Sequence, residues 1–197
     1  MNAKLILAVS GAALLAPAQS FAATTTPPAT SVQADVTVVG RVASLCVLGT
    51  PSSPQIDVGQ MAATSGTRVG KIATLPAQSV VLDGSFCNFG GTMLTVDATA
   101  LTNLDDGGVA PPANFARAVN YTATASNWAG INAAATTAAL GDGSSATKTG
   151  LGGTQGTPKL SAINLEVSNF TVPADSLMVS GRYQGAVRIT LGPAGVE

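Results

Sequence analysis

The sequence of 197 residues contains no histidine and few aromatic or charged side chains. Without histidine, the chain has no Ser-His-Asp or Cys-His triad and no histidine ligand for zinc. It also lacks a Gly-x-Ser-x-Gly nucleophile motif. The glycine-rich stretches 66–72 and 150–156 miss the spacing of phosphate-binding and dinucleotide-binding loops. The sequence therefore predicts no catalytic residue, no cofactor and no metal site, and indicates that the protein is not an enzyme.

Charge is scarce throughout the chain. Charged residues make up 10% of the sequence, compared with about 25% in ordinary soluble domains. Lys and Arg together number nine, whereas nucleic-acid binding depends on clustered basic side chains, so nucleic acid is not an expected partner. A chain rich in Thr, Val and Gly instead suits strands that pack on both faces or are covered by a neighbour.

The N-terminus has the three parts of a secretion signal. Lys4 is followed by an apolar run from Leu5 to Leu15, and the small residues Ser20 and Ala22 offer a cleavage site. The run is too short for a membrane anchor, which needs roughly 20 residues. We therefore expect a cleaved signal peptide at 1–22, an extended N-terminal arm at 23–31 and one domain at 32–197.

The sequence has only two cysteines, Cys46 and Cys87. In an exported chain the redox environment favours a bond between them, and two free buried thiols are the less favoured alternative. Closing a loop of this length stabilises a fold by roughly 4 kcal/mol in the chain-entropy model.

Apolar residues alternate with polar ones near both ends of the domain. From residue 32 to Cys46 this period of two predicts a strand with Cys46 on its inward face. The last predicted strand, 182–191, places four side chains on one face: Tyr183, Val187, Ile189 and Leu191.

Further strands are predicted between these two. They cover residues 56–58, 78–87, 92–96, 117–124 and 163–168, whereas 130–158 reads as a long loop with a short helix at 133–140. About seven short strands and a disulfide predict an all-β chain folded as a β-sandwich.

Several motifs resemble those of chaperone–usher pilin subunits. An alternating strand with a glycine precedes the first cysteine, the short strand 55–59 ends in glycine, and the second cysteine closes the strand Ser85-Phe86-Cys87. The C-terminal stretch 180–191 is similar to the terminal strand of the spore-coat-U-type branch.

The resemblance implies an immunoglobulin-like sandwich that lacks one strand. The last strand would line one wall of an apolar groove through Tyr183, Val187, Ile189 and Leu191, and the first strand would line the other. An extended donor segment would fill the groove and complete the sheet. The candidate donor residues are Val32, Ala34, Val36 and Val38.

The expected function is therefore that of a structural subunit of a bacterial pilus. The resemblance implies other pilin-like subunits, a periplasmic chaperone and an outer-membrane usher as partners. It also implies passage through the periplasm to the cell surface.

The arm departs from the donor pattern, because residues 23–31 contain Pro27-Pro28 and no bulky apolar side chain. The alternative is a secreted or cell-surface adhesin or coat protein with a self-complete sandwich. Such a protein would bind a host or abiotic surface, with 130–158 as its recognition loop.

Overall fold

The computed structural model describes residues 33–105 and 109–195, and the chain divides into two units, 1–41 and 42–197. In the first unit, residues 33–41 are exposed and form neither helix nor strand. The predicted signal peptide, the arm at 23–31 and Val32 lie outside the described residues.

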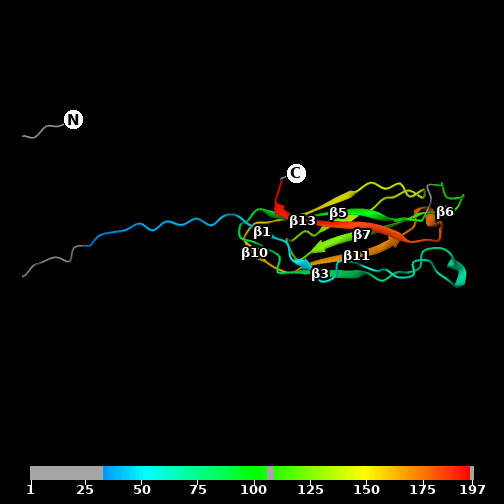
Figure 1. Cartoon of the computed structure of the whole chain (residues 1–197), viewed down its shortest axis with the longest axis horizontal. Helices are drawn as coiled ribbons and strands as arrows, with labels where there is room; N and C mark the ends of the chain where they lie inside the picture. Colours follow the sequence, from blue (N-terminus) through cyan, green and yellow to red (C-terminus); the bar gives the residue numbers. More distant parts are fainter. Residues whose placement is uncertain (1–32, 106–108, 196–197) are drawn as a thin grey trace, which may run out of the picture. The chain divides into compact units, whose positions relative to one another are not determined.

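The second unit is all-β, and its long strands run side by side (Figure 1). One group contains β5 (Thr92–Asn103), β9 (Lys148–Gln155) and β13 (Tyr183–Pro193), with β5 between the other two. The pairs that β5 forms with β13 and β9 are antiparallel.

A second group is built around β7 (Ala118–Ser126) and β11 (Ile163–Thr171), which pair with each other. On one side β8 (Ala133–Thr136) pairs with β7; on the other, β11 pairs with β3 (Gln78–Asp83) and β3 with β2 (Thr50–Pro51). The groups join where Leu101 and Thr102 of β5 pair with Val119 and Ala118 of β7.

Short elements close the two ends. At one end, β4 (Phe86–Cys87) lies between β1 (Cys46–Val47) and β10 (Lys159–Leu160). Near the other end, marked by β6 in Figure 1, β6 (Phe115–Ala116) pairs in parallel with β12 (Leu177–Met178). The 3₁₀ turns η1 (Gly66–Arg68) and η2 (Pro173–Asp175) complete the elements of the described residues.

The core lies between the two groups of strands. Alternate residues of β5, β7 and β11 point into it, as the period of two requires. Its most completely buried members are Val96, Ala123, Ala125, Trp128, Ala133 and Ile163.

One side of the sandwich is sealed by backbone packed against backbone. A Cβ on Gly150 in β9 would overlap the carbonyl oxygen of Ala134 in β8, and the amide of Gly153 donates to Ile131 O at 2.9 Å. Glycine is required at position 150 because no side chain fits between strands β8 and β9.

This seam shows that one sequence-based expectation was wrong. Residues 133–136 and 148–155 are strands within the predicted loop 130–158, and no helix forms at 133–140. Small residues suit a strand here because β8 and β9 approach too closely for larger ones. Bulk, the usual signal of a strand, is therefore absent.

The first predicted strand also differs. Of residues 33–46 only Cys46 belongs to a strand, because the alternating run has no neighbouring strand to supply a hydrogen-bonded ladder. The strand predicted at 56–58 does not form either, whereas 92–96 extends to Asn103 as β5. The strand predicted at 78–87 is broken at Gly84, whose φ is +74°.

Candidate functional site

A long groove lies on the side of the second unit opposite the β8–β9 seam. Its volume is about 1090 Å³, above the roughly 300–1,000 Å³ of small-molecule pockets. Its walls come from β13 and from the segment after β2, the two ends of the strand order, and its floor comes from β7 and β11. The groove is therefore bounded by the two ends of the strand order in the described residues.

The first wall is the inward face of β13. Tyr183, Val187 and Ile189 line the groove, and Leu191 packs against the main core. All four are half-buried and alternate with exposed residues, as the sequence predicted. β13 pairs with β5 along one edge, and no described strand pairs with its other edge. That edge presents free backbone donors and acceptors.

The second wall is the segment 51–59, which follows β2. Ile56 and Val58 are half-buried, whereas Gln55 and Asp57 between them are exposed. The alternation is that of a strand, yet residues 55–61 belong to none. This wall therefore has the side-chain pattern of a strand and lacks a partner on its groove side.

Tyr121 of β7 lies in the groove floor with Val167 and Phe170 of β11. Its hydroxyl donates to Thr99 O at 2.7 Å, and Ala186 O lies 3.2 Å away. Burial raises the pKa of Tyr121 to about 12. The neutral phenol thus ties the floor to β5 and β13.

A β-bulge interrupts the first wall between Tyr183 and Val187. The β5–β13 register shifts between Gln184 and Ala186, and Gly185 lies at that shift. A Cβ on Gly185 would lie 2.7 Å from Thr99 O and 2.9 Å from Ala100 O. A side chain does not fit there, so Gly185 contributes only backbone to the groove lining.

The candidate donor residues belong to the first unit. Val36 and Val38 are 84% and 91% exposed, Ala34 is also exposed, and none is in a strand. Val32 lies outside the described residues. The described part of this run thus offers alternating apolar side chains to a partner.

The predicted disulfide is confirmed. Cys46 and Cys87 are bonded across directly opposed positions of β1 and β4. A disulfide indicates an oxidising, exported compartment. Within residues 33–105 and 109–195, no helix is long and apolar enough to cross a membrane.

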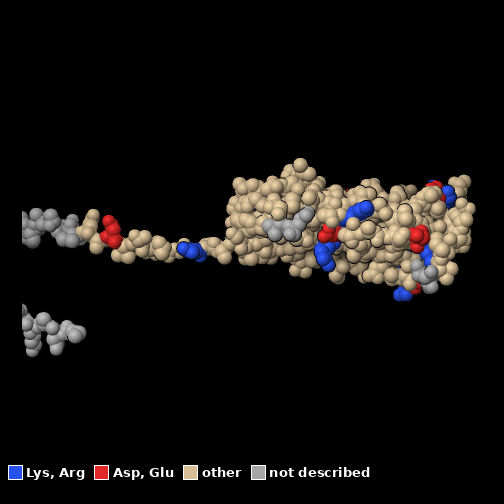
Figure 2. All heavy atoms as spheres, turned by 90° about the horizontal axis from the view of Figure 1, so that it is seen from above, with Lys and Arg blue, Asp and Glu red and all other residues tan. Residues whose placement is uncertain are grey.

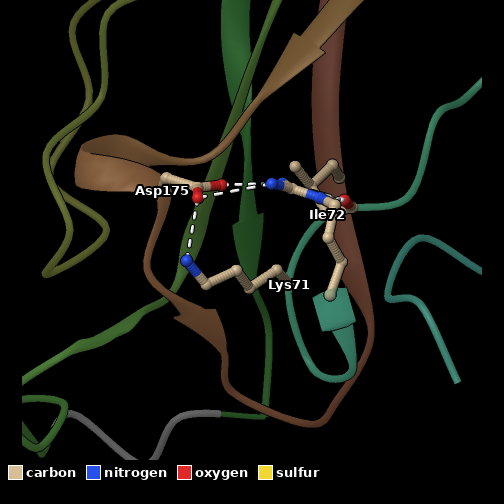
Figure 3. Close-up of polar contacts among 4 residues, drawn as sticks. Lys71, Ile72 and Asp175 are labelled. Atoms are coloured by element: carbon tan, nitrogen blue, oxygen red, sulfur yellow. Dashed lines mark hydrogen bonds and ion pairs between the residues drawn. The ribbon is translucent and has the colours of Figure 1, made fainter. Parts of the chain in front are cut away.

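Ion pairs fix loops at the end of the unit that carries η2 and at the groove mouth. Asp175 of η2 accepts from Arg68 at 2.7 Å and from Lys71 at 2.8 Å (Figure 3), and the Arg68 hydrogen bond is the main reason that the pKa of Asp175 falls to about 2. Asp105 pairs with Arg182 at 2.8 Å, chiefly through a side-chain hydrogen bond that lowers the pKa of Asp105.

No three Cys, Asp and Glu side chains of the described chain are grouped as metal ligands. Asp106, the neighbour of Asp105, lies outside the described residues.

Sequence reasoning missed half of the groove. It assigned the second wall to the first strand, whereas residues 51–59 form it, and it gave no role to Tyr121 or Phe170. The alternation of Ile56 and Val58 was the available signal for the wall. The floor residues carry no such signal, because in sequence they look like any buried strand residues.

A comparison of the chain with protein-family models, with curated proteins and with solved structures finds no match.

Proposed function

We propose that this chain is a structural subunit of a bacterial surface fibre, assembled by donor-strand complementation. Its fold is then an immunoglobulin-like sandwich that lacks one strand. The proposal is carried by one observation: a groove of about 1090 Å³ lies between β13, whose outer edge is unpaired, and the alternating segment 51–59.

The chemistry of the groove favours an extended peptide as its occupant. The free edge of β13 offers main-chain hydrogen bonds, and Val187 and Ile189 offer apolar contacts to alternate side chains of the incoming segment. The run from residue 32 to Val38 supplies apolar side chains at every second position. A chaperone would fill the groove during export, and the run of another copy would fill it in the fibre.

The test is a denaturing gel of material sheared from the native cell surface, loaded with and without boiling and probed for this chain. Strand-exchanged polymers give a ladder of multiples that collapses to one band on boiling. A single monomer band without boiling contradicts the proposal, and favours a surface adhesin with a self-complete sandwich.

A further inference from the structure

An outward-facing apolar row crosses the disulfide end of the second unit. In the β1–β4–β10 sheet, Val47 and Leu160 both lie directly opposite Phe86. Cys46 and Cys87 point toward the core from the neighbouring row, so these three side chains point outward. Leu160 is 73% exposed, Val47 39%, and Leu45 beside them 50%. We call Leu45, Val47, Phe86 and Leu160 the apolar row.

The surroundings of the apolar row carry little charge. Figure 2 shows no Lys, Arg, Asp or Glu on the drawn face at the end that Figure 1 labels β1 and β10. Lys159, between Pro158 and Leu160, points away to the carbonyl oxygen of Trp128. Four neighbouring apolar side chains on the surface are more typical of a protein–protein contact than of a surface that remains in water.

Chain length limits what can cover the row in a fibre. The groove-lining stretch from Gly181 to Ile189, which includes the first part of β13, spans nine residues, so a donor that fills it needs about nine of its own. A donor that begins at Val32, the first candidate donor residue, ends at Gly40 and leaves residues 41–45 before β1. Five residues reach about 17 Å at most. The disulfide end of the donating copy is therefore held against the copy whose groove it fills.

The direction of the groove identifies the opposing surface. β13 runs from Tyr183, which pairs with Asn103, to Pro193, which pairs with Thr92 close to the disulfide end. In a head-to-tail fibre all copies have the same orientation. The disulfide end of one copy then faces the Tyr183 end of the next. There Leu104, 51% exposed, lines the groove mouth, followed by Val109 at 68% and Phe115 at 39%.

From these observations we infer that the apolar row of one copy packs against the groove mouth of the next copy, at Leu104, Val109 and Phe115. This inference rests on the proposed function. It adds a second, body-to-body contact to the strand exchange, and its partner is another copy of this chain.

Site-specific photo-crosslinking in assembled fibres tests the contact. The photo-reactive amino acid p-benzoylphenylalanine replaces Leu160 in one variant and Leu45 in a second. In a control it replaces Leu151 of β9, which is 52% exposed and lies outside the row. After irradiation, the Leu160 and Leu45 variants should give multimers that survive boiling, with crosslinks mapped by mass spectrometry to residues 103–116. The Leu151 control should not.

The gel without boiling separates two ways to fail. A ladder before boiling with no boiling-resistant multimers from Leu160 or Leu45, or with equal crosslinking from Leu151, overturns the contact and leaves strand exchange standing. The absence of any ladder before boiling overturns both the contact and the proposed function.

Discussion

Tyr121 is the residue at which the groove floor and the last strand are joined. Its ring is buried among residues of both sheet groups, and its hydroxyl reaches carbonyl oxygens on β5 and β13. These contacts hold in place the bulge beside Gly185. A single phenol therefore positions the wall that an incoming strand would meet.

Replacing Tyr121 with Phe should lower the unfolding free energy by about 1 kcal/mol at neutral pH, since one hydrogen-bonding group is lost. The pKa of about 12 in the folded chain lies above the usual value of 10, so the folded state favours the neutral phenol. The stabilisation is complete below pH 10 and is lost as the pH rises through 12.

Urea unfolding from pH 8 to pH 12 measures this effect. The unfolding free energy of the wild-type chain should fall more steeply above pH 10 than that of Tyr121→Phe, so that the difference between them shrinks. Parallel curves would show that Tyr121 ionises equally in the folded and unfolded chains.

The sequence predicted the β13 wall of the groove, but not the second wall or the floor. The inward face of β13 followed from alternation alone, because one-sided burial imposes a period of two on Tyr183, Val187 and Ile189. The bulge at Gly185 depends on carbonyl oxygens of another strand. The local pattern does not reveal which distant segments pair with each other. That pairing determines that residues 51–59, and not the first predicted strand, form the second wall.

At the scale of elements, β13 and the β8–β9 seam are the two sides of the sandwich, one open and one sealed. Val187 of β13 faces the groove, whereas Thr190 of the same strand is exposed on the opposite face. A charge introduced at position 187 would therefore lie in the groove, whereas a charge introduced at position 190 would lie in solvent.

Val187→Arg should abolish the boiling-sensitive ladder, because an incoming strand would have to bury the guanidinium. Thr190→Arg, the matched control, should leave the ladder intact. Circular dichroism of both variants checks that the sheet is retained. Equal ladders from the two would contradict a role for this groove in assembly.

Gly150→Ala should destabilise the domain by about 1–3 kcal/mol, the usual cost of overpacking, since its methyl group overlaps backbone atoms of β8. Gly130→Ala is the control, because a Cβ there has no neighbour within 4 Å and the φ of Gly130 is not positive. Denaturant midpoints of the two variants measure the difference. Similar midpoints would show that the seam opens at little cost.

At the scale of the whole molecule, the disulfide and the all-β class followed from the sequence, whereas the strand count did not. The strong alternation at residues 32–46 predicted a strand that the single chain does not form. The small residues at 133–155 gave no strand signal, although two strands form there. Both errors have the same cause: a strand exists only where another strand pairs with it.

A synthetic peptide of residues 33–45 should stabilise the chain expressed without residues 1–22. Binding to the folded state alone adds about 2.7 kcal/mol at a peptide concentration of 100 times Kd, which thermal unfolding would report as a higher Tm. The same peptide with Val36→Asp and Val38→Asp is the control. Equal effects, or none, would show that this run is not a donor for the groove.

The sealed β8–β9 seam also bears on how many neighbours one copy can have. Backbone contact at Gly150 closes that side, so the described sandwich has one such groove, and each chain has one alternating run. Under the proposed donor-strand assembly, such a monomer would have what polymer chemistry calls a functionality of two. Growth would then be linear, without branching or gelation, and fibre length would be set by whatever occupies the last open groove.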